Sequence, residues 1–102
     1  MTVVALVPDL MDQSRIRAAL ADVEVTFVRD PARAADAAVV IVDLARFADR
    51  IAEIRAATTG RIVAFGPHVD DDVLAAARSA GADVVVPRSQ FFRDPADLVT
   101  GA

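Results

Sequence analysis

The sequence has no cysteine and no lysine among its 102 residues, and it has only four glycines. The absence of cysteine excludes disulfides, thiolate nucleophiles and thiolate metal sites. The glycines are too scattered to form a glycine-rich phosphate loop, and no G-x-S-x-G motif is present. Residue content and spacing alone therefore exclude several common classes of enzyme.

Long hydrophobic runs and clustered positive charge are missing as well. No apolar stretch approaches the roughly 18 residues of a membrane span, and the N-terminal MTVVALVPDLMD lacks the basic segment of a signal peptide. We expect a cytoplasmic protein with no membrane partner. The net charge of -4 argues against direct nucleic-acid binding, which needs clustered cations. All eleven basic residues are arginine and 22 residues are alanine, a bias typical of GC-rich bacterial genomes.

Five short apolar runs alternate with helical patterns along the chain. The runs cover residues 3–7, 23–28, 39–42, 62–65 and 84–86. Continuous runs of this length are typical of parallel strands that helices cover on both faces. The sequence therefore predicts a flavodoxin-like three-layer α/β/α sandwich with a five-stranded parallel sheet in the order 2-1-3-4-5. One domain over residues 1–102 accounts for the whole chain.

Helix signals separate the predicted strands. We expect helices over residues 12–21, after Asp30-Pro31, around the apolar stripe of Phe47, Ile51 and Ile54, from the Asp70 to Asp72 run to Gly81, and after Asp94-Pro95. The three consecutive aspartates lack the spacing of a calcium loop and are interpreted as a helix start. The last helix has room for only one or two turns.

The polar residues that follow the strands define a candidate site. In an open parallel sheet, ligands bind beyond the carboxyl ends of the strands. Asp9, Asp43 and His68 follow neighbouring strands and are expected to converge there, with Arg88 beside them.

The chain resembles the receiver domains of response regulators in the order of its elements. The stretch over residues 61–91 resembles them most, with its Gly81-Ala82-Asp83 turn after a helix. By this resemblance, Asp43 falls at the position of the phosphorylated aspartate. Asp9 falls at the position of an acid that, with Asp43, holds Mg²⁺, the cation that would screen both anions during phosphoryl transfer.

Other positions depart from the receiver pattern. Pro8 replaces one of two adjacent acids, and Asp12, three residues beyond Asp9, is interpreted as a helix cap. Gly66 replaces a hydroxyl residue, and Arg88 replaces a lysine. The guanidinium of arginine pairs with anions in a flat fork, unlike the point charge of an ammonium group. The proline-rich loop that normally follows the phospho-acceptor is absent.

Three functions are consistent with these residues. The first is a phosphorylation-independent interaction or regulatory module without enzymatic activity, acting through a protein partner or as a homodimer. The second is a Mg²⁺-dependent receiver that accepts phosphate on Asp43.

The third function is binding of a small ligand or anion at the carboxyl edge of the sheet. Its candidate anion-binding residues are Arg88, Ser89 and His68, the single histidine. Phe91 and Phe92 are candidate interface residues, because exposed aromatic area marks contacts with partners. The alternative is that one of them closes the core while the other covers the sheet edge.

Overall fold

The computed structural model describes residues 1–67 and 71–101 and contains one five-stranded sheet. The strands are β1 (Val3–Leu6), β2 (Val25–Phe27), β3 (Val39–Asp43), β4 (Arg61–Gly66) and β5 (Val84–Pro87). Their order is β2-β1-β3-β4-β5, and all neighbouring pairs are parallel. The predicted sheet order and fold class are therefore confirmed.

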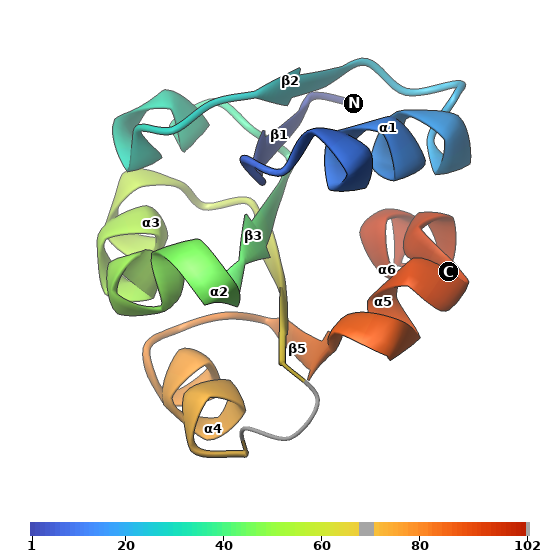
Figure 1. The fold of residues 1–102 in the computed structure, drawn as a ribbon. Coiled ribbons are helices and arrows are strands. Elements are labelled where there is room, and N and C mark those ends of the chain that lie inside the picture. The colour runs from blue at the N-terminus through green and yellow to red at the C-terminus, as the bar shows by residue number, and fades with distance from the viewer. Residues whose placement is uncertain (68–70, 102) are drawn as a thin grey trace.

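Helices cover both faces of this sheet (Figure 1). One face carries the 3-10 turn η1 (Pro31–Ala34), α2 (Leu44–Phe47), the 3-10 turn η2 (Ala48–Arg50), α3 (Ile51–Ala57) and α4 (Asp71–Ser79). The other carries α1 (Leu10–Ala19), α5 (Arg88–Arg93) and α6 (Pro95–Thr100). No helix among the described residues is long and apolar enough to cross a membrane.

Alternation along the strands produces two separate hydrophobic cores. In β3, Val40 and Val42 contribute to the core beneath α3 and α4, while Val39 and Ile41 contribute to the core beneath α1 and α5. All four side chains are at least 96% buried. Both faces need apolar residues because helices cover both, which explains why the strands appear in the sequence as continuous apolar runs.

Two predicted elements are shorter in the structure than the sequence suggested. Strand β2 pairs with β1 only over Val25–Phe27, although the alternating pattern covers residues 23–28. The segment opened by Asp30-Pro31 forms a single 3-10 turn rather than an α-helix, although Asp30 caps it as predicted. Only a few residues separate it from β3, and so short a segment gains too few hydrogen bonds to offset helix nucleation.

The helix that follows β3 is divided into three pieces. The stripe of Phe47, Ile51 and Ile54 does face the core, but a 3-10 turn interrupts the helix after Phe47. Ile51 and Ile54 are fully buried, whereas Phe47 is partly buried. The apolar periodicity therefore predicted the buried face correctly and the continuity of the helix wrongly.

The C-terminal region holds two short helices where one was expected. No helix was predicted between the strand over residues 84–86 and the cap at Asp94-Pro95, yet α5 begins at Arg88 directly after β5. The predicted cap is present in α6, where the Asp94 carboxylate accepts a hydrogen bond from the Asp97 N–H at 3.2 Å and Pro95 occupies the first turn. At six residues, α5 is too short for a periodic pattern to mark it.

Candidate functional site

The strand register brings the predicted site residues to one edge of the sheet. Asp43 is the last residue of β3 and lies beside Phe65 of β4. Gly66 of β4 pairs with Pro87 of β5, so Arg88 begins α5 immediately beyond the same edge. Asp9 follows β1 and lies at the start of α1. His68 falls outside the described residues.

Asp43 is a buried carboxylate that caps a helix. Its side chain is only 5% exposed, and its Oδ1 accepts a hydrogen bond from the Ala45 N–H at 2.9 Å. Burial raises the pKa of Asp43 above the ordinary 3.8, and this is the largest effect. The hydrogen bond from the Ala45 N–H lowers the pKa, the negative charge of Asp12 raises it, and the positive charge of Arg88 lowers it. The carboxylate thus combines a structural role with an environment that favours the protonated form.

Two aspartates of α1 have roles different from those that the sequence suggested. Asp12 was expected to cap the helix, but the cap is Asp9, whose Oδ1 accepts from the Asp12 N–H at 2.9 Å. The Asp12 side chain is instead buried against the sheet, with the residue 3% exposed. Asp12 lies one turn before the buried Ile16, so the helical repeat already placed it on the inner face.

Asp12 forms a forked ion pair with Arg88, which lies 76 residues away in the sequence. Arg88 Nη1 donates to Asp12 Oδ2 at 2.8 Å, and Arg88 Nη2 donates to Asp12 Oδ1. The hydrogen bonds that Arg88 donates to the Asp12 carboxylate raise the pKa of Arg88, which stays charged. Sequence reasoning placed Arg88 at this edge but missed its partner, because Asp12 was already explained as a cap.

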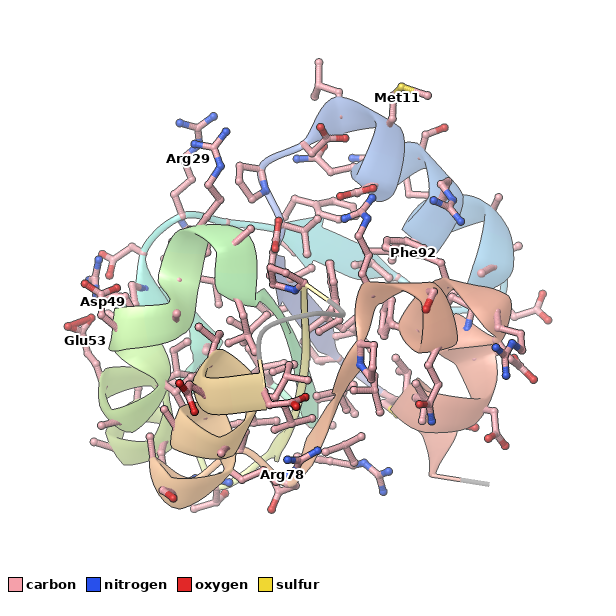
Figure 2. All side chains as sticks on the ribbon, turned by 60° about the horizontal axis from the view of Figure 1, so that its bottom comes forward. Met11, Arg29, Asp49, Glu53, Arg78 and Phe92 are labelled. Carbon is pink, nitrogen blue, oxygen red and sulfur yellow. The ribbon has the colours of Figure 1, made fainter. Side chains whose placement is uncertain are left out.

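Three phenylalanines support the ion pair from the side of α5. Phe65 stacks on Phe91 with a centroid distance of 4.6 Å, and Phe92 meets both rings edge-on. The Arg88 guanidinium lies 4.9 Å from the centroid of the Phe92 ring, a cation–π distance. Figure 2 shows Phe92 between α1 and α5, where it contributes to the joint between the two helices.

The two candidate interface residues have different positions. Phe91 is fully buried in the core beneath α1 and α5, so its interpretation as a contact for a partner is wrong. Phe92 is only partly buried. Ser89 is exposed in the first turn of α5. The alternative in which one phenylalanine closes the core is the arrangement that the structure shows.

Comparisons with known proteins identify this fold. The chain is similar to a response regulator from Thermotoga maritima, with a TM-score of 0.74 and 16% identity over 97% of each chain. A response regulator from Hahella chejuensis gives a TM-score of 0.70 and 23% identity over 98% of this chain and 87% of that one. No known protein family and no curated protein matches the sequence.

A third similar structure extends beyond this chain. It is a response regulator from Burkholderia pseudomallei that contains a phosphorylated aspartic acid, with a TM-score of 0.80 and 13% identity. The match covers 96% of this chain, which spans 65% of the length of that protein. The fold of the chain is thus that of response-regulator receiver domains.

The carboxylates at the sheet edge do not fit the Mg²⁺ ion that receiver domains imply. Both Asp12 oxygens hold Arg88, and one oxygen each of Asp9 and Asp43 holds a helix N–H. Within residues 1–67 and 71–101, no group of three or more acidic or histidine side chains that could hold a metal ion is present. The fixed positive charge at this edge is the Arg88 guanidinium.

Proposed function

We propose that this chain is a phosphorylation-independent, receiver-like module that regulates or binds another protein, or a second copy of itself, in the cytoplasm. The observation that carries the proposal is the forked pair of Arg88 with Asp12. The cation that replaces the receiver lysine is already held by an internal carboxylate. A phosphoryl group on Asp43 would have to compete with this pair to recruit it.

Two further features of the edge support the proposal. Asp43 is buried and capped, which restricts the approach of a phosphodonor to its carboxylate. Gly66 replaces the hydroxyl residue of receivers, and a Cβ at this position would lie 3.1 Å from Leu74 and 3.2 Å from Leu44. The packing leaves little space for a side chain that could follow a phosphoryl group.

The competing function is a receiver that accepts phosphate on Asp43 with Mg²⁺. The observation that favours this function is the position of Asp43 at the end of the central strand, beside Phe65. The two functions differ in whether Asp43 gains a covalent phosphoryl group, which changes the mass of the protein.

The test is incubation with acetyl phosphate and Mg²⁺, followed by intact mass spectrometry. We expect no adduct of about 80 Da, the mass of one phosphoryl group, in either the wild type or Asp43→Asn. An adduct on the wild type that is absent from Asp43→Asn would overturn the proposal. A phosphorylatable receiver domain run in parallel confirms that the donor is active.

The partner class is tested by sedimentation velocity over a range of concentrations. Leu10 and Met11, at the start of α1, are 78% and 77% exposed and are among the exposed large apolar side chains of the described residues. Exposed apolar area of this kind favours association. A concentration-dependent dimer would indicate that the partner is a second copy of the chain. A protein that stays monomeric would indicate that the partner is a different protein.

A further inference from the structure

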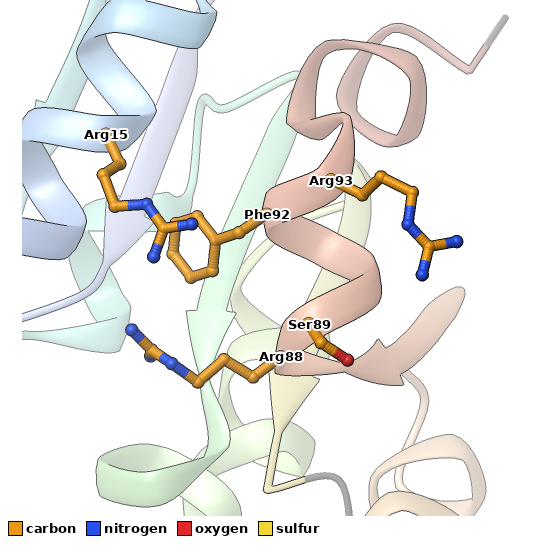
Figure 3. A pocket seen from close by; sticks show the side chains of 5 residues that line it. All are labelled: Arg15, Arg88, Ser89, Phe92 and Arg93. Carbon is orange, nitrogen blue, oxygen red and sulfur yellow. The ribbon is translucent and has the colours of Figure 1, made fainter.

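A surface hollow of about 360 Å³ lies over α5, on the side of the molecule that α1 shares. Its lining residues are Arg15, Arg88, Ser89, Phe92 and Arg93. Figure 3 shows Arg15 and Arg88 on the side of α1, with Ser89 and Arg93 on the other side of the helix. Three of the five side chains are guanidinium groups, in a chain whose net charge is -4.

All the charged residues that line the hollow are arginines. Arg88 is paired with Asp12 through one donor on each Nη, which leaves its other N–H groups available. Among the described residues, Arg15 and Arg93 form no salt bridge, and the Ser89 hydroxyl has no hydrogen-bond partner. Asp12, Asp43 and Asp9 act electrostatically on Arg88, but none of them lines the hollow. The lining therefore presents the charges of Arg15 and Arg93 without an ion-pair partner in the described part of the chain, which favours an anionic occupant.

Arg15 is also held in position before any ligand arrives. Its guanidinium carbon lies 4.1 Å from the centroid of the Phe92 ring, and Arg88 approaches the same ring at 4.9 Å. Stacking on a ring occupies the face of a guanidinium and leaves its N–H edge free for a bidentate contact with an oxyanion. Less side-chain freedom is lost on binding when the donor is already fixed.

We propose that this hollow binds an oxyanion, either a phosphate or a carboxylate group. Arg15 and Arg88 would contact it from the side of α1, while Ser89 and Arg93 line the hollow from the other side of α5. Asp43 does not line the hollow, so an oxyanion bound there is a ligand distinct from a phosphoryl group on Asp43. The inference goes beyond the proposed function, with which it shares Arg88. The oxyanion could be a free ion or an acidic side chain of a partner chain.

The experiment is an NMR titration of the ¹⁵N-labelled protein with inorganic phosphate, using sodium chloride at equal ionic strength as the reference. We expect phosphate to shift the Nε–Hε signals of Arg15 and Arg88, and Arg15→Gln to weaken binding about tenfold, the effect of one charge-assisted bond. Arg15→Lys keeps the charge but loses the fork, and is expected to weaken binding to an intermediate degree.

Arg17→Gln is the matched control. Arg17 lies on the same helix and also stacks on a phenylalanine, Phe27, at 4.6 Å, but it does not line the hollow. We expect it to bind phosphate as the wild type does. The proposal is overturned if neither phosphate nor an oligoglutamate peptide shifts an arginine signal, or if Arg17→Gln weakens binding as much as Arg15→Gln.

A parallel titration with a short blocked oligoglutamate peptide distinguishes the sources of the anion. Tighter binding of the peptide than of phosphate would assign the hollow to carboxylates of a protein partner, and the reverse order would assign it to free phosphate. An oligoserine peptide of equal length controls for contacts with the peptide backbone. Both orders support an oxyanion site, provided that Arg15→Gln weakens whichever ligand binds.

Discussion

The two edges of the sheet each contain an arginine–aspartate pair, and the two pairs are built differently. At the amino edge, Arg55 binds Asp83 at 3.0 Å and donates to the backbone carbonyls of Gly81, Thr58 and Gly60. At the carboxyl edge, both Nη atoms of Arg88 donate to the Asp12 carboxylate. The first arginine joins loops of the backbone, while the second neutralises a buried side chain.

The two arginines thus satisfy different kinds of acceptor. Loops at the amino edge have carbonyls that must find donors, and Arg55 supplies four hydrogen bonds there. Nothing in the backbone requires Arg88 and Asp12 to be charged, since an apolar pair of similar size could fill the space. The charges of this pair are therefore not required by the backbone around them.

The largest expected effect comes from removing one partner of the carboxyl-edge pair. Arg88→Met leaves Asp12 buried without its cation, which we expect to lower the free energy of unfolding by about 3 kcal/mol. Asp12→Asn should cost less, about 1 kcal/mol, because the Arg88 side chain is 44% exposed and can be hydrated. Urea denaturation measures both.

Arg93→Met is the control for the carboxyl edge, since Arg93 lies on the same helix and forms no salt bridge among the described residues. The double variant Asp12→Asn with Arg88→Met should recover part of the loss. Equal losses of unfolding free energy in the two single variants would show that the burial of Asp12 does not determine the stability of the ion pair.

The second effect tests the amino edge. Arg55→Met removes four hydrogen bonds, three of them to carbonyls, and we expect it to lower the free energy of unfolding by about 2 kcal/mol. Phosphate binding should be unchanged in this variant, whereas Arg88→Met should weaken it.

The control for the amino edge is Arg50→Met. Arg50 forms an exposed ion pair with Glu53, three residues further along the chain. Loss of this pair should leave the melting temperature unchanged. If Arg55→Met also weakened phosphate binding as much as Arg88→Met does, the contrast between the edges would be lost.

The sheet and its two cores could be predicted because apolar alternation is a local signal. Residues 39–42 show by themselves that both faces of the strand are covered. The same reasoning brought Asp43 and Arg88 to one edge, since the carboxyl ends of parallel strands share it. The Asp94-Pro95 cap was equally local, and it is present in α6.

The pairing of charges could not be predicted, because it depends on distances that the sequence does not contain. Asp9 and Asp12 both lie near the start of one helix, and either could cap it by residue type alone. Only the packing of α1 against the sheet buries Asp12 and brings it to Arg88, 76 residues away. Helix α5 was missed for a related reason, since tertiary contacts of Phe91 stabilise a segment too short to show a period.

The smallest expected effect is a difference in pH dependence between the edges. Burial raises the pKa of Asp43, so the folded protein holds this proton more tightly than the unfolded chain does. Its contribution to the free energy of unfolding therefore falls as the pH rises from the ordinary 3.8 to the folded pKa. Asp43→Asn removes this loss and keeps the cap, because asparagine also accepts from the Ala45 N–H.

Asp83 at the amino edge should behave in the opposite way. The bond from the Ile62 N–H lowers the pKa of Asp83, so its contribution is present above the ordinary 3.8 and is lost as the pH falls through the folded pKa. At neutral pH, Asp43→Asn should thus be more stable than the wild type and Asp83→Asn less stable, the latter by a small amount because the Asp83 side chain is 48% exposed. Denaturation curves from about pH 3 to about pH 7 measure both differences, which should shrink toward acid. Shifts of the same sign in both variants would mean that burial at the carboxyl edge does not outweigh the hydrogen bond from Ala45 to Asp43.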